Sequence, residues 1–147
     1  MKTVAIIPAR LHSTRFPKKI LYLIDEKPMV VHVYENAKKS EIIDDVFVAV
    51  DDDETIKELK KWKVKTMMTG VDHVSGTDRI YEASKTINAD IIVNVQADEP
   101  FIDHNLIDLI VKEFDDESIE IVTAAGKSLN AKQLNDYNTV KVMLDSD

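Results

Sequence analysis

The sequence of 147 residues contains no cysteine and only three glycines, and both shortages exclude whole classes of functional site. Without cysteine the chain forms no disulfide, has no thiolate nucleophile and cannot bind zinc through sulfur, which is consistent with a cytoplasmic location. The glycines stand at positions 70, 76 and 126. This placement excludes a G-x-G-x-x-G dinucleotide loop and a G-x-x-x-x-G-K-[ST] phosphate loop. No apolar run reaches the ~20 residues of a membrane helix, so we expect no membrane partner.

Acidic residues are missing from the start of the chain, where none precedes Asp25. The whole chain carries a net charge of −8, but its first 40 residues contain eight basic and three acidic side chains. The overall negative charge argues against nucleic acid or an anionic membrane as a partner, because neither phosphates nor acidic lipids attract such a surface. The basic N-terminal segment of this acidic chain therefore needs a local explanation.

The hydrophobic pattern predicts a single α/β domain over residues 1–147. A hydrophobic content of 44% and a charged content of 31% are typical of a globular protein. Short β-branched runs alternate with segments of helical period. The pattern predicts strands at 3–7, 46–50, 64–68, 91–95, 119–124 and 138–144, and helices at 28–40, 52–62, 75–87 and 103–114. This alternation predicts a mostly parallel sheet covered on both faces, with ligands beyond the carboxyl ends of its strands.

The first candidate segment is P-A-R-L-H-S-T-R-F-P-K-K-I-L, residues 8–21, which directly follows the first predicted strand. Arginine binds phosphate through two parallel hydrogen bonds, and lysine supplies a mobile point charge. A triphosphate is therefore a suitable ligand, and a solvated basic loop is the alternative. The cations and hydroxyls concerned are Arg10, Arg15, Lys18, Lys19, Ser13 and Thr14.

The second candidate segment is N-V-Q-A-D-E-P-F, residues 94–101, at the end of a predicted strand. It carries Gln96 and the adjacent carboxylates of Asp98 and Glu99. Mg²⁺ uses one or two carboxylates together with phosphate oxygens and water, which suits an aspartate in this place. A turn before Pro100, with Asp98 bonded to its own backbone, is the alternative interpretation.

The third candidate segment is H-V-S-G-T-D-R, residues 73–79. Gly76 allows a ligand to approach the backbone closely, and backbone groups with small hydroxyls at a helix start can contact a base edge. Helix capping alone is a sufficient explanation for Ser75. Residues 51–54 are interpreted mainly as a helix start, although Asp51 at a strand end could also face a ligand.

Together these segments resemble the 3-deoxy-manno-octulosonate (KDO) cytidylyltransferase family, also called CMP-KDO synthetases. The resemblance covers essentially the whole chain and implies a three-layer Rossmann-like nucleotide-diphospho-sugar transferase fold. The matching motifs occur in the family's order. They are I-I-P-A-R-x-x-S-T-R-[LF]-P-x-K-x-L at 6–21, K-P-M-[IV]-x-H-V at 27–33, A-x-D at 49–51, M-T-x-x-x-H-x-S-G-T-[DE]-R at 68–79, V-N-V-Q-G-D-E-P at 93–100 and N-x-V-K-V at 138–142.

The resemblance implies a cytoplasmic, homodimeric enzyme of lipopolysaccharide biosynthesis that converts CTP and KDO into CMP-KDO and pyrophosphate with Mg²⁺. It assigns Arg10, Lys19 and Asp98 to catalysis, with Asp98 as the metal ligand. The triphosphate would be bound by Arg10, Ser13, Arg15 and Lys19, the cytidine side by His73, Ser75 and Gly76, and the junction with the sugar by Gln96.

The chain also departs from the family pattern. Lys18 and Ala97 stand where the family usually has glycine, and Ile20 stands where it has proline. Chains of the family continue beyond position 147. The resemblance implies that this further part supplies a second metal carboxylate, much of the sugar pocket and the dimer interface. We therefore expect an incomplete fold. A CTP-binding chain without turnover, and a nucleotidyltransferase for another acidic sugar such as a sialic acid, are the alternative functions.

Overall fold

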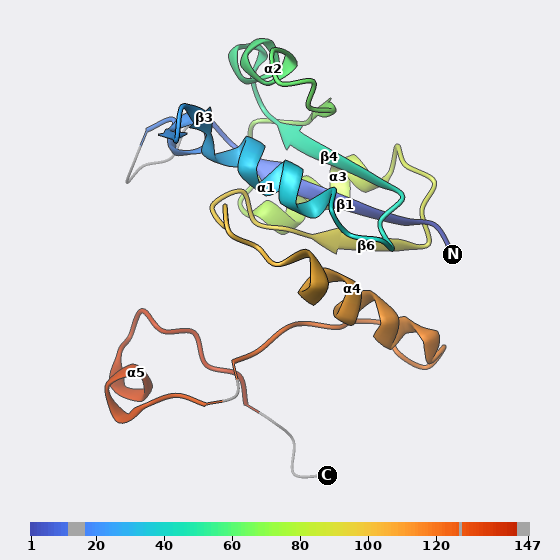
Figure 1. Ribbon diagram of the computed structural model, residues 1–147, viewed down its shortest axis with the longest axis vertical. Helices are drawn as coiled ribbons and strands as arrows, with labels where there is room; N and C mark the ends of the chain where they lie inside the picture. The colour runs from blue at the N-terminus through green and yellow to red at the C-terminus, as the bar shows by residue number, and fades with distance from the viewer. Residues whose placement is uncertain (12–16, 127, 144–147) are drawn as a thin grey trace.

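A four-stranded parallel sheet forms the centre of the protein (Figure 1). The computed structural model describes residues 1–11, 17–126 and 128–143. The strand order is β5-β4-β1-β6, so the first strand lies in the interior of the sheet. All three strand pairs are parallel, as the alternation of strands and helices predicts. The strands are β1 (Thr3–Ala9), β4 (Asp45–Val50), β5 (Thr66–Met68) and β6 (Ile91–Asn94).

Helices cover both faces of this sheet, because the side chains of β1 alternate between two apolar clusters. Ala5 and Ile7 belong to the cluster that includes residues of three helices, namely α1 (Met29–Ala37), α2 (Asp53–Lys60) and α4 (His104–Lys112). Val4 and Ile6 pack with residues of α3 (Gly76–Ser84) on the other face. The predicted three-layer α/β arrangement is therefore confirmed. Among the residues that the structure describes, no helix is both long and apolar enough to cross a membrane.

Side-chain caps set the starts of the helices that follow β4 and β5. The Asp52 carboxylate accepts a hydrogen bond from the Thr55 amide at 2.8 Å, and α2 begins at the next residue after Asp52. Ser75 and Asp78 form a reciprocal capping box at the start of α3. Both helix starts are close to the predicted positions, because capping depends on neighbouring residues alone.

The connection from β1 to α1 contains a small hairpin that the sequence pattern did not reveal. The short helix η1 (Lys19–Leu21) leads into β2 (Leu23–Ile24) and β3 (Lys27–Pro28), which pair antiparallel. Asp25 and Glu26 turn the chain with φ values of 47° and 64°. Two successive left-handed residues usually include asparagine or glycine, and neither is present here.

The last two predicted strands, residues 119–124 and 138–144, were wrong over their described residues. After η2 (Glu113–Asp115) the chain leaves the sheet, and its only further helix in the described part is α5 (Ala131–Asn135) (Figure 1). Ile121 is 86% exposed and Val140 is 87% exposed. Among the described residues β6 pairs only with β1, and a groove of about 670 Å³ lies between β6, α4 and residues 120–124. Apolar alternation predicts which face of a strand can be buried, but a strand also needs a hydrogen-bonded neighbour.

Candidate functional site

Most of the candidate residues lie at the edge of the sheet where its parallel strands end. Arg10 follows β1, Asp51 follows β4, and Gln96 and Asp98 come soon after β6. The chain leaves β1 for β4 on one side and later returns to β6 on the other side. Such a reversal of strand order opens a crevice at the carboxyl ends of the strands, where α/β proteins bind their ligands.

Lys19 and Asp98 meet at this edge of the sheet. The Lys19 ammonium donates a hydrogen bond to Asp98 Oδ2 at 2.7 Å, and the two side chains are 40% and 50% exposed. The pair thus joins a residue predicted to bind phosphate to the predicted metal ligand. An exposed pair of this kind contributes only about 0–1 kcal/mol to stability. A ligand can therefore replace either partner at little cost.

The loop that carries the other predicted phosphate ligands is described only at its two ends. Arg10 is exposed directly after β1, while Ser13 and Arg15 lie outside the described residues. The Lys18 amide donates to the carbonyl of Leu11 at 3.1 Å, which brings the ends of the loop together.

Lys18, the extra cation of this loop, is in a conformation that favours glycine. Its φ is 56°, which is the left-handed region that residues with a Cβ usually avoid. The ammonium group pairs with Glu54 Oε1 of α2 at 2.5 Å. The charge of Lys18 is thus directed to α2, whereas Lys19 reaches Asp98.

Gly76 and Gln96 are neighbours, as their predicted roles require. A Cβ added to Gly76 would lie 3.0 Å from Pro8 Cγ and 3.8 Å from Gln96 Oε1. Glycine suits this position because β1 packs closely against the start of α3, and a side chain here would crowd Pro8. Gln96 in turn donates from its side-chain amide to Asn94 Oδ1 at 2.7 Å. The structure places the start of α3 beside the segment that follows β6.

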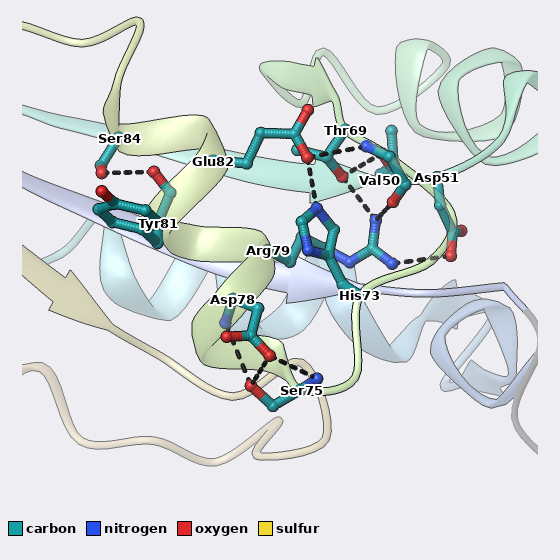
Figure 2. Close-up of polar contacts among 11 residues, drawn as sticks. Val50, Asp51, Thr69, His73, Ser75, Asp78, Arg79, Tyr81, Glu82 and Ser84 are labelled. Atoms are coloured by element: carbon teal, nitrogen blue, oxygen red, sulfur yellow. Dashed lines mark hydrogen bonds and ion pairs between the residues drawn. The ribbon is translucent and has the colours of Figure 1, made fainter.

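The Ser75 hydroxyl is engaged in the cap of α3. Ser75 Oγ donates to Asp78 Oδ2 at 2.7 Å and accepts from the Asp78 amide at 3.1 Å, as Figure 2 shows. These bonds explain why a serine stands here without any ligand. A contact between Ser75 and a nucleotide stays a prediction.

His73 is held by Glu82, a residue to which the sequence motifs assign no role. His73 Nε2 contacts Glu82 Oε2, and the same oxygen accepts from the Gly70 amide at 2.9 Å (Figure 2). The Gly70 N–H, followed by the His73 contact, lowers the pKa of the Glu82 carboxyl below its ordinary value. Glu82 thereby anchors the loop that contains His73 to α3.

A buried ion pair between Asp51 and Arg79 lies behind this loop (Figure 2). Arg79 Nη2 donates to Asp51 Oδ2 at 2.9 Å, and the side chains are only 3% and 8% exposed. The other carboxylate oxygen, Oδ1, accepts from the Leu11 amide at 3.1 Å. Sequence reasoning left the role of Asp51 open and gave none to Arg79. One feature of the sequence points to the burial of Arg79: it lies on the same helix face as Ile80 and Ala83, which are both buried.

The fold belongs to the three-layer α/β class, and its polar groups lie at the edge of the sheet where proteins of this class bind ligands. Residues 4–147 match the family described as cytidylyltransferase, so the chain belongs to the cytidylyltransferase family. This finding confirms the family resemblance seen in the sequence motifs.

Similar proteins carry a more specific name. The chain is 40% identical over 148 aligned positions to the 3-deoxy-manno-octulosonate cytidylyltransferase of Pelobacter propionicus, covering 100% of this chain and 58% of the relative. It is 44% identical over 149 positions to the enzyme of the same name from Geobacter metallireducens, covering 99% of this chain and 58% of the relative.

Among solved structures, a CMP:2-keto-3-deoxy-manno-octonic acid synthetase complexed with CTP superposes with a TM-score of 0.78 at 39% identity. The match covers 80% of this chain and 49% of that one. The chain thus spans 58% of the two named relatives and matches about half of the solved structure.

Proposed function

We propose that this chain provides the nucleotide-binding part of a cytidylyltransferase that transfers CMP from CTP to KDO and releases pyrophosphate. The observation that carries the proposal is the contact between Lys19 and Asp98 at 2.7 Å, at the switch point of the sheet. Relatives that span this chain and carry the name 3-deoxy-manno-octulosonate cytidylyltransferase support the choice of sugar.

In the proposed reaction, the anomeric hydroxyl oxygen of KDO forms a bond to the α-phosphorus of CTP. The bond from that phosphorus to the oxygen bridging to the β-phosphate breaks, pyrophosphate leaves with the bond's electron pair, and the hydroxyl proton is released to water. Such a transfer depends mainly on positioning and on stabilising negative charge. Arg10 and Lys19 supply positive charge that stabilises it, and Ser13 and Arg15 are further proposed phosphate ligands.

We propose Asp98 as the ligand of a Mg²⁺ ion that enters with CTP. Among the described residues, no three side chains of His, Asp or Glu are grouped so that they could hold a metal. The residues present fit an ion that is bound by one carboxylate and mainly by phosphate oxygens and water, as is typical of Mg²⁺. The Asp98 side chain is 50% exposed and thus accessible. When bound, the ion neutralises phosphate charge and helps pyrophosphate to leave.

We assign the cytidine side to His73, Ser75 and Gly76, and the sugar junction to Gln96. Support comes from the close packing of Gly76 against Pro8 and its nearness to Gln96. The two assignments thereby fall next to each other, as the joined halves of CMP-KDO require. A homodimer and a cytoplasmic location stay predictions, which sedimentation velocity and cell fractionation would test.

The direct test is pyrophosphate release by this chain from CTP, KDO and Mg²⁺. We expect release that depends on KDO, and a loss of about 10²-fold or more in Asp98→Asn. Asp115→Asn, a matched change at an exposed site in η2, should leave the rate unchanged. CTP binding without release would favour the alternative of a chain that binds without turnover, and release with a sialic acid in place of KDO would change the proposed sugar.

A further inference from the structure

The buried pair of Asp51 and Arg79 lies between the two halves of the proposed CTP site. We infer that this pair is a brace that sets the spacing between the phosphate side and the cytidine side of the site. The inference rests on the proposed function, because it assigns a positioning role within that same site. The phosphate side means residues 8–11 and 17–21, and the cytidine side means residues 69–76.

On the phosphate side, the brace holds the backbone next to Arg10. The Leu11 amide donates to Asp51 Oδ1 at 3.1 Å. Leu11 is itself 3% exposed, and its carbonyl accepts from the Lys18 amide at 3.1 Å. Asp51 Oδ1 thus holds the backbone at Leu11, where the phosphate loop begins.

On the cytidine side, the Arg79 guanidinium holds the loop that leads to α3. Nη1 donates to Thr69 Oγ1 at 2.5 Å and to the Gly70 carbonyl at 3.1 Å (Figure 2). The Thr69 hydroxyl in turn donates a hydrogen bond to the carbonyl of Val50 at 2.8 Å. The loop is thereby tied both to Arg79 and to the end of β4.

The two sides meet in the contact between Arg79 Nη2 and Asp51 Oδ2 at 2.9 Å. A planar guanidinium can hold three acceptors at fixed angles, whereas a lysine ammonium is a single point on a flexible stem. Arg79→Lys therefore keeps the positive charge beside Asp51 but gives up the contacts to Thr69 and Gly70. The variant should loosen the cytidine side while Asp51 continues to hold Leu11.

This geometry makes a prediction that fold stabilisation alone does not make. In CTP the triphosphate and the cytidine are covalently linked, so the second contact forms at high effective concentration only when the two sides are correctly spaced. Inorganic tripolyphosphate uses the phosphate side alone. Loss of the brace should therefore weaken CTP binding much more than tripolyphosphate binding.

The experiment measures the dissociation constants of CTP and of inorganic tripolyphosphate by calorimetry, each with Mg²⁺, for the full 147-residue chain and its Arg79→Lys variant. We expect CTP affinity to fall about tenfold and tripolyphosphate affinity to change less than about twofold. Lys85→Arg, at the exposed far end of α3, is the matched control and should change neither. Thr69→Val, which removes one acceptor of Arg79 at constant size, should reproduce the same pattern more weakly and serves if Arg79→Lys does not fold.

Equal losses for both ligands, or no loss for either, would overturn the brace, since Arg79 would then only maintain the fold or be irrelevant to binding. Failure of the unsubstituted chain to bind CTP would instead overturn the proposed function, and the brace with it. The two failures are thus distinguishable.

Discussion

Two ion pairs at the same edge of the sheet differ in almost every physical respect. Lys19–Asp98 has side chains that are 40% and 50% exposed, whereas Arg79–Asp51 has side chains that are 3% and 8% exposed. The exposed pair makes one contact between two groups suited to bind phosphate and metal. The buried pair is extended by hydrogen bonds to Leu11, Thr69 and Gly70. The difference separates groups that exchange their partners for a ligand from groups that keep the site in shape.

The largest expected effect is the difference in stability between these two pairs. Arg79→Ala should lower the free energy of unfolding by about 3–5 kcal/mol, because it leaves the Asp51 carboxylate buried without its partner. Lys19→Ala should lower it by less than about 1 kcal/mol, because water and salt already screen that pair. Urea unfolding of both variants measures the difference, and equal losses would remove the distinction between the pairs.

The close packing behind the site can be tested with two glycines of the same region. Gly76→Ala should destabilise the protein by about 1–3 kcal/mol, because its Cβ would press on Pro8 at 3.0 Å. Gly70→Ala is the matched control, since its Cβ would meet the flexible Glu82 side chain at 3.4 Å. We expect the control to cost less than about 1 kcal/mol in the same urea unfolding experiment. A larger loss for Gly70→Ala than for Gly76→Ala would contradict the prediction that packing is tighter at Gly76.

A smaller effect concerns two lysines held in the left-handed region, Lys18 with φ 56° and Lys63 with φ 57°. Lys63→Gly should raise the thermal midpoint, with a gain of about 0.5–1 kcal/mol, because glycine adopts this conformation without steric cost. Lys18→Gly should gain less, because it also removes the pair with Glu54. An equal gain for Lys18→Gly would show that this exposed pair contributes nothing.

The smallest expected effect is a loss of the anchor of the His73 loop at low pH. The pKa of Glu82 is lowered in the folded protein by the Gly70 N–H and then by His73. A lowered pKa means that this anchor is fully present above the ordinary value of 4.5 and is lost as pH falls through the folded value. The Gly70 amide resonance, followed by NMR, should shift below pH 4.5 in the unsubstituted chain and not in Glu82→Gln. An identical titration in both chains would assign the transition to another group.

Local sequence pattern predicted the four strands of the sheet and its four main helices, because periodicity and capping depend on nearby residues. Asp52 and Ser75 show this most clearly, since each caps a helix that begins at the next residue. The strands predicted at 119–124 and 138–144 failed because pairing depends on a neighbour from elsewhere in the fold. The β2–β3 hairpin was missed because Asp25-Glu26 is not a usual turn sequence.

In the candidate site too, features set by local motifs could be predicted, whereas features set by the packed fold could not. The structure brings Lys19 to Asp98 and Gly76 to Gln96, because the ends of parallel strands converge on one edge, while their roles stay predictions. The roles of Arg79 and Glu82 could not be predicted, since they arise from burial and from contacts with loops. Burial of a charged side chain depends on the packed fold and leaves little trace in the sequence.

The most direct test of the central claim is the affinity of the chain for CTP with Mg²⁺ in Lys19→Ala and Lys38→Ala. Lys38 is an exposed lysine at the end of α1, stacked near Tyr34 and remote in sequence from the phosphate loop. We predict that Lys19→Ala lowers CTP affinity about tenfold or more while lowering stability by less than about 1 kcal/mol, and that Lys38→Ala leaves the affinity unchanged. Equal weakening by both substitutions would contradict the account, because the basic loop would then act only as a diffuse positive surface.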